Sequence, residues 1–159
     1  MRYLSIFVFA VLVVPSFAIA GEPLTPRPLD PLAADAFARA QAQSAIVRSL
    51  VATLESSNVI VHIVSSRNLP AGIGGTTRFV TSRGGYRYVR ITIAVDLSQS
   101  GRTTILGHEL QHACEVAASA ADDAESVKQL FARNGRRVGE YYETRAAVNT
   151  ERLVRMGRD

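Results

Sequence analysis

The sequence predicts a single α+β domain in which a short, mostly antiparallel sheet packs on helices. Three observations lead to this fold class. Apolar residues recur every three or four positions over residues 37–54, as expected of an amphipathic helix. A β-branched run and a hairpin-like stretch with a Gly-Gly pair follow it. The remaining chain is then expected to form three further helices, one of which has a capping-box pattern.

The N-terminal residues have the three parts of a secretory signal peptide. Arg2 supplies a positive charge, residues 4–14 form an almost unbroken apolar run, and Ala18-Ile19-Ala20 is a small-x-small cleavage signature. The apolar run is short for a membrane span of about 20 residues. We therefore expect cleavage after Ala20, a secreted or periplasmic protein, and no stable insertion into a membrane after cleavage.

The first predicted helix follows a proline-rich segment. Four prolines in residues 21–31 indicate an extended leader, not a packed element, so the domain is expected to span residues 32–159. Asp30 followed by Pro31 has the pattern of an N-cap with proline at the first helical position. The apolar spacing over residues 37–54 then predicts one amphipathic helix.

Two segments predict the sheet. Residues 58–64 are β-branched at nearly every position, which is typical of a strand covered on both faces. Residues 76–96 predict a β-hairpin around a Gly-Gly turn, with Val80 paired to Val89. His62 lies within the first of these strands, where we expect a core or rim residue and not a metal ligand.

Three helices are expected in the C-terminal half. The first runs from about residue 103 to residue 120. Asp122 with Glu125 three residues later forms a capping-box pattern for a short helix, which the Asn-Gly pair at 134–135 ends. The last helix is expected over residues 138–156. This order of helix, strand, hairpin and helices completes the α+β prediction.

Charge and cysteine content limit the possible partners. Of the 18 basic residues all but Lys128 are arginines, and they are scattered along the chain. Scattered charges favour a solvated surface with weak attraction to anionic envelope polymers, and no nucleic-acid partner is expected. Cys114 is the single cysteine, so no internal disulfide is expected, and we predict that it is a small buried apolar residue.

Residues 108–112, with the sequence His-Glu-Leu-Gln-His, fall on the first of the three C-terminal helices. Because a helix turns by about 100° per residue, His108 and His112 lie one turn apart on the same face. Both imidazoles can therefore bind one Zn²⁺ ion. Glu109 lies at the flank of that face, where it can act as general base towards a zinc-bound water whose pKa falls to about 7.

Two carboxylates are candidates for the third zinc ligand, because no histidine follows His112. Glu115 lies on the same helical face, and Glu143 lies in the last predicted helix. Three ligands at offsets 0, 4 and 7 of one helix would spread over roughly 10 Å, too far for a single ion. Glu143 is therefore preferred, since the last helix can lie across the motif helix. Glu115 stays the alternative, and is otherwise expected behind the ligands or in solvent.

The His-Glu-x-x-His motif with a downstream Glu-Thr-x-Ala, residues 143–146, resembles the gluzincin class of zinc metallopeptidases, especially its very small members. The order of an N-terminal helix, a short sheet, the motif helix and a glutamate helix is also similar to theirs. The resemblance implies a thermolysin-like mechanism. It also implies zinc ligation by His108, His112 and Glu143, with Glu109 as the general base.

The sequence therefore predicts a secreted zinc-dependent metallopeptidase that acts on a peptide or protein substrate. The alternative is a secreted domain that binds zinc without catalysis, or an interaction domain of the cell envelope. If the protein is a peptidase, an extended substrate is expected to add to the edge of the strand at residues 86–95, which directly precedes the motif helix.

Overall fold

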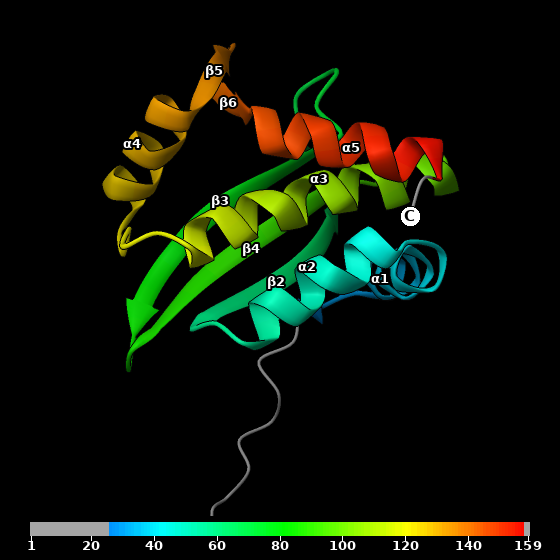
Figure 1. Cartoon of the computed structure of the whole chain (residues 1–159). Helices are drawn as coiled ribbons and strands as arrows, with labels where there is room; N and C mark the ends of the chain where they lie inside the picture. Colours follow the sequence, from blue (N-terminus) through cyan, green and yellow to red (C-terminus); the bar gives the residue numbers. More distant parts are fainter. Residues whose placement is uncertain (1–25, 158–159) are drawn as a thin grey trace, which may run out of the picture.

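The computed structural model describes residues 26–157, so the predicted signal peptide and the first part of the proline-rich leader lie outside the described residues. This part of the chain forms an α+β fold with one four-stranded and one two-stranded sheet (Figure 1). The elements are β1 (Arg27–Pro28), α1 (Pro31–Gln43), α2 (Ala45–Glu55), β2 (Val59–Ser66), β3 (Gly75–Arg83), β4 (Tyr86–Ala94), α3 (Gln99–Ala117), α4 (Ala124–Asn134), β5 (Gly135–Val138), β6 (Tyr141–Thr144) and α5 (Arg145–Met156). Over residues 26–157, none of the helices combines the length and the apolar character that crossing a membrane requires.

The four-stranded sheet is mixed, whereas the sequence predicted a mostly antiparallel one. Its strand order is β1-β2-β4-β3, in which β2 pairs in parallel with both β1 and β4, and only the β3–β4 hairpin is antiparallel. The leader prediction is wrong at its end, because Arg27–Pro28 forms β1 and Pro26 is buried. Hairpin signals report only neighbours in sequence, so the parallel pairings had no local signature.

The hairpin turns at Gly84 and Gly85 as predicted, and both have positive φ angles, of 60° and 82°. Its register differs by one residue, since Phe79 and not Val80 pairs with Val89. A bulge after Phe79 takes up the extra residue and leaves Val80 exposed. β4 lies inside the sheet, between β2 and β3, so the predicted edge at residues 86–95 is wrong; the edge strands are β1 and β3.

The N-terminal helical segment is two helices, not one. Asp30 caps α1 as predicted, and its Oδ1 accepts a hydrogen bond from Ala33 N. Ser44 adopts an extended conformation, ends α1, and caps α2 by accepting from Val47 N. The apolar spacing continues across this corner, because both helices bury one face on the same core, and so the spacing alone could not reveal the break.

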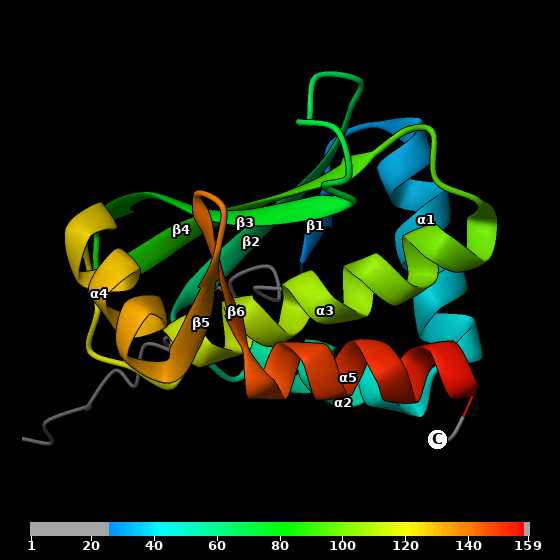
Figure 2. The ribbon, with the colours of Figure 1, turned by 90° about the horizontal axis from the view of Figure 1, so that it is seen from above.

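The C-terminal half departs most from the prediction. The motif helix is α3, and α4 ends at Asn134 as predicted, but Asp123 and not Asp122 caps it, through a capping box with Ser126. Residues 135–144 form the β5–β6 hairpin where a helix was expected. The last helix, α5, begins at Arg145 and runs alongside α3 (Figures 1 and 2).

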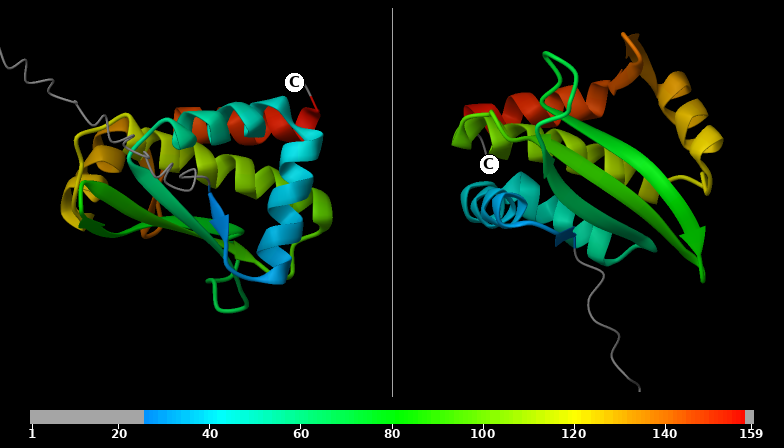
Figure 3. Two further views of the ribbon diagram at one scale, coloured as in Figure 1. Left: turned by 90° about the horizontal axis from the view of Figure 1, so that it is seen from below. Right: turned by 180° about the vertical axis from the view of Figure 1, so that it is seen from behind.

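The hydrophobic core lies between the sheet and α1, α2 and α3. Alternate residues of β2 and β4 are fully buried on this side, together with two leucines of α3: Val59, Val61, Ile63, Val89, Ile91, Ile93, Leu106 and Leu110. Cys114 is buried as predicted, and burial, with the Glu115 charge nearby, raises the pKa of its thiol to about 12. No helix of residues 26–157 covers the other face of the sheet (Figure 3), although the sequence predicted cover on both faces.

Candidate metal centre

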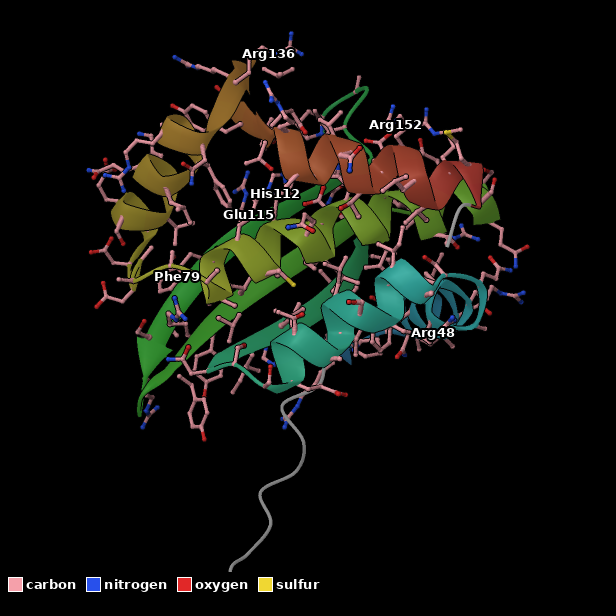
Figure 4. All side chains as sticks on the ribbon, viewed as in Figure 1. Arg48, Phe79, His112, Glu115, Arg136 and Arg152 are labelled. Atoms are coloured by element: carbon pink, nitrogen blue, oxygen red, sulfur yellow. The ribbon has the colours of Figure 1, made fainter. Side chains whose placement is uncertain are left out.

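The two histidines of the motif lie on the middle of α3 and are almost completely buried. Each is 5% exposed, and their ring centroids lie 4.9 Å apart with the planes at 73°. The predicted one-turn spacing therefore puts both rings on one face of the helix. Figure 4 shows His112 and Glu115 on α3, close to where the chain passes from β6 into α5. The Phe131 ring, from α4, packs in a T-shaped arrangement with the His112 ring, with the ring centroids 5.0 Å apart.

Glu143 reaches this histidine pair from β6 and not from a helix. Its Oε2 lies 3.0 Å from His108 Nε2. One candidate ligand atom from each of His108, His112 and Glu143 lies within 4.8 Å of the others, the only such group of three or more within residues 26–157. Zinc ligands bonded at 2.0–2.1 Å are about 3.3 Å apart, so modest side-chain rotations would close the group around one ion.

Each histidine uses its other ring nitrogen to contact a carboxylate. His108 Nδ1 lies 3.1 Å from Glu151 Oε2, and His112 Nδ1 lies 2.9 Å from Glu115 Oε2. A neutral imidazole that donates from Nδ1 presents the lone pair of Nε2, the arrangement found in metal-binding histidines of the carboxylate–histidine–metal type. Glu115 therefore lies behind a ligand, as expected if Glu143 and not Glu115 completes the group.

Both supporting carboxylates are themselves held in place. Glu115 Oε1 accepts a hydrogen bond of 2.6 Å from Thr144 Oγ1, next in sequence to Glu143. The second oxygen of Glu151 pairs with Arg155, one turn further along α5. The orientation of each histidine ring is therefore fixed through a carboxylate that has its own partner.

Glu109 is buried and lies outside the group of possible ligands. Its Oε2 accepts a hydrogen bond of 2.7 Å from Thr77 Oγ1 of β3. The Gly75 backbone packs against the same side chain, since a Cβ there would lie 2.8 Å from Glu109 Oε1. Burial raises the pKa of Glu109 above its ordinary value, although His112, His108 and Thr77 act in the opposite direction. The carboxylate is thus fixed in position and readily protonated.

The charges of the centre act on one another. Burial alone would lower the pKa of His108, but the hydrogen bond to Glu143 and the neighbouring carboxylates raise it above its ordinary value. The same hydrogen bond lowers the pKa of Glu143, with burial acting against it. The cluster therefore favours a positive charge between His108 and Glu143, which a proton or a metal cation can supply.

A cleft of about 360 Å³ opens beside the centre, between β3, α4 and the β5–β6 hairpin. Glu109, His112 and Glu143 line it together with apolar side chains, among them Phe79, Val127 and Phe131. The possible metal-binding group and an apolar wall meet in this cleft, a combination typical of ligand-binding sites.

The four residues that the sequence pattern singled out lie together in the structure: Glu109, His112 and Glu143 line the cleft, and His108 contacts Glu143. Glu151 and Thr77, which reach the centre from α5 and β3, were not predicted. Their contacts depend on tertiary packing, and neither residue stands at a distinctive spacing from the motif. His62 lies on the outer face of the sheet and does not belong to the group of possible ligands.

No protein-family model, curated protein or solved structure matches the chain. The resemblance to gluzincins therefore rests on the motif residues and their geometry.

Proposed function

We propose that the protein is a secreted zinc-dependent metallopeptidase of the gluzincin type. The observation that carries this proposal is the carboxylate behind each motif histidine, with Glu143 next to His108 Nε2. Surface histidines have no need of such half-buried carboxylate partners, whereas metal-binding histidines commonly have them. The donor set of two imidazoles and one carboxylate suits zinc and leaves a fourth position open.

In this proposal His108, His112 and Glu143 hold the ion, which would polarise a peptide carbonyl and make water a stronger nucleophile at neutral pH. Glu109 would accept a proton from the attacking water and pass it to the leaving amine. Burial supports this role, because it makes the carboxylate a better proton acceptor than an exposed glutamate. Thr77 would keep the carboxylate turned towards the cleft.

The substrate would lie along β3 and not along β4. Within the described residues β3 pairs only with β4, and its residues from Gly75 to Phe79 line the cleft. An extended peptide can add to such a free edge through backbone hydrogen bonds. This geometry would bring a peptide carbonyl past Glu109 while its side chains meet the apolar wall near Phe131.

The proposal is tested by metal analysis and peptide hydrolysis on the purified full chain. Elemental analysis should find about one zinc per chain, and His112→Ala should abolish it. Glu109→Gln should retain zinc but lose hydrolysis of a fluorogenic peptide library. Glu140→Gln, a matched change at an exposed position lining the same cleft, should retain both.

The two carboxylate variants distinguish the ligand from the supporting group. Glu143→Ala should weaken zinc binding severely, and Glu115→Ala by about 10- to 100-fold. If freshly purified protein holds no zinc above background, the proposal is lost. If zinc is bound stoichiometrically but no peptide is cleaved, the protein is a non-catalytic zinc-binding domain.

A further inference from the structure

A row of basic side chains crosses the four-stranded sheet and takes no part in the proposed zinc centre. The strand pairings place four residues side by side, one from each strand, in the order Arg27, His62, Arg90 and Arg78. Paired residues on neighbouring strands lie about 4.8 Å apart and point to the same face, so this basic row is about 14 Å long. It runs from one edge of the sheet to the other.

The basic row lies on the outer face of the sheet. His62 stands between Val61 and Ile63, and Arg90 between Val89 and Ile91, four residues that are fully buried on the helical side. Because successive residues of a strand point to opposite faces, the row points away from the helices. Figure 3 (right) shows the sheet from this side, with no helix across it.

The sheet strands carry positive charge only. Together β1, β2, β3 and β4 contain five arginines and no aspartate or glutamate. Arg87 alone of the five points to the helical side of the sheet, where it is buried and donates to carbonyls at the C-terminal end of α3. Arg78 and Arg90 are exposed, and within residues 26–157 neither forms an ion pair.

This arrangement costs stability instead of providing it. Like charges directly opposite each other on neighbouring strands are destabilising, and Arg78 and Arg90 are such a pair. Burial and the positive charges of Arg27 and Arg90 lower the pKa of His62. The two arginines therefore both repel a positive charge placed between them. A negatively charged partner would relieve this repulsion.

We propose that the basic row binds a linear anionic polysaccharide laid across the strands. The rows on either side are uncharged, with Ile60 beside Tyr88 and Val64 beside Thr92, and the other outward arginine, Arg83, lies two rows away at the hairpin turn. The positive charge across the middle of the sheet therefore forms a line and not a broad patch. A line fits a chain of carboxylate or sulfate groups better than the flat surface of a membrane. Single-stranded nucleic acids are bound by several stacked aromatic rings, whereas on β2, β3 and β4 Tyr88 is the only aromatic side chain in a row adjacent to the basic row.

The row ends at the cleft, because Arg78 lines both. A polysaccharide bound along the row would anchor the protein to an anionic matrix. The cleft, at the end of the row, would stay open to solvent. This inference does not depend on zinc or on peptide hydrolysis, and its test uses neither.

Binding of a fluorescently labelled heparin oligosaccharide to the full chain tests the proposal by anisotropy between 25 and 150 mM NaCl, about the range in which such contacts are salt-sensitive. The wild type should bind, and Arg78→Gln/Arg90→Gln should weaken binding at least about tenfold. The slope of log Kd against log[NaCl] should fall by about one or more, because fewer charges contact the polysaccharide. The matched control Arg48→Gln/Arg152→Gln removes the same charge from exposed positions on α2 and α5 (Figure 4) and should change affinity less than about threefold.

The melting temperature separates a binding role from a structural one. Because the sheet variant loses like-charge repulsion, it should unfold at the same temperature as the wild type or higher. A clearly lower melting temperature would show that the arginines are structural and would overturn the proposal. Equal weakening in both double variants, or no heparin binding, would also overturn it. So would tighter binding to oligo(dT) or to phosphatidylglycerol vesicles through the same two arginines.

Discussion

Replacing Gly75 by alanine should displace the proposed general base without touching the zinc ligands. A Cβ at this position would lie 2.8 Å from Glu109 Oε1 and 2.6 Å from Cγ2 of Ile105. Ordinary contacts begin at 3.4 Å, so the carboxylate must retreat by about 0.6 Å, the difference between 3.4 and 2.8 Å. Because Glu109 is buried and bonded to Thr77, it can move only by losing that hydrogen bond or by shifting β3.

The expected effect on rate follows from this displacement. A misplacement of 1 Å at a reacting centre can cost about 100-fold in rate, so a shift of this size should lower kcat/KM by about tenfold. The added methyl group also overpacks the core, which should lower the free energy of unfolding by about 1–3 kcal/mol. Zinc content should stay unchanged, because the atoms nearest the added Cβ belong to Ile105 and Glu109 and not to His108, His112 or Glu143.

The preceding glycine provides a matched control. A Cβ on Gly74 would lie 3.0 Å from Ile105 Cγ1 and would not approach Glu109. Gly74→Ala therefore presses on the same isoleucine and loses the same backbone freedom, but leaves the base in place. Peptide hydrolysis, zinc content and urea unfolding are measured for both variants. If Gly75→Ala hydrolyses peptides as fast as Gly74→Ala, the position of Glu109 does not depend on Gly75 in the way argued.

Three further predictions concern the rest of the molecule. Glu151→Gln should weaken zinc binding by about 10- to 100-fold in a competition titration, because a neutral amide holds His108 less firmly. Removing zinc with a chelator should lower the melting temperature. The free energy of unfolding should fall by about 4 kcal/mol if zinc was present at 1,000 times its Kd. Burial raises the pKa of Asp30, but hydrogen bonds from Ala33 and Ser65 outweigh it and hold the pKa below 3.8. The stability that Asp30 provides should therefore be complete above about pH 4 and disappear as the pH falls through the lowered pKa. Urea unfolding of wild type and Asp30→Asn should converge at low pH.

Local signals predicted the parts of the fold that depend on neighbours in sequence. The Asp30-Pro31 pair marked the start of α1, and the one-turn spacing of His108 and His112 placed both rings on one face. These features follow from helix geometry and capping, which act over three or four residues. The same reasoning placed the end of α4 at Asn134.

The features that were mispredicted depend on contacts between distant segments. Nothing in residues 59–66 shows that the parallel neighbour on one side is β4, more than 20 residues later. The region around Glu143 was predicted as the first part of a helix over residues 138–156. Gly139, with a φ of 62°, instead turns a hairpin, and Thr144 starts the helix after it. Glu143 nevertheless lies beside His108, although it was preferred on the expectation that it belonged to the last helix. It comes from β6 instead, directly before Thr144, the N-cap of α5.

The hydroxyl of Thr144 has two hydrogen-bond partners, one in the backbone of α5 and one in a side chain of α3. It accepts a hydrogen bond from Ala147 N at the start of α5, and it donates to Glu115, which contacts His112. The start of α5 and the orientation of His112 on α3 therefore depend on the same hydroxyl group. We expect the amide of Ala147 to exchange with solvent in the same cooperative unit as the centre of α3. Local opening of the β5–β6 hairpin would then expose the first turn of α5 and release the cluster in a single step.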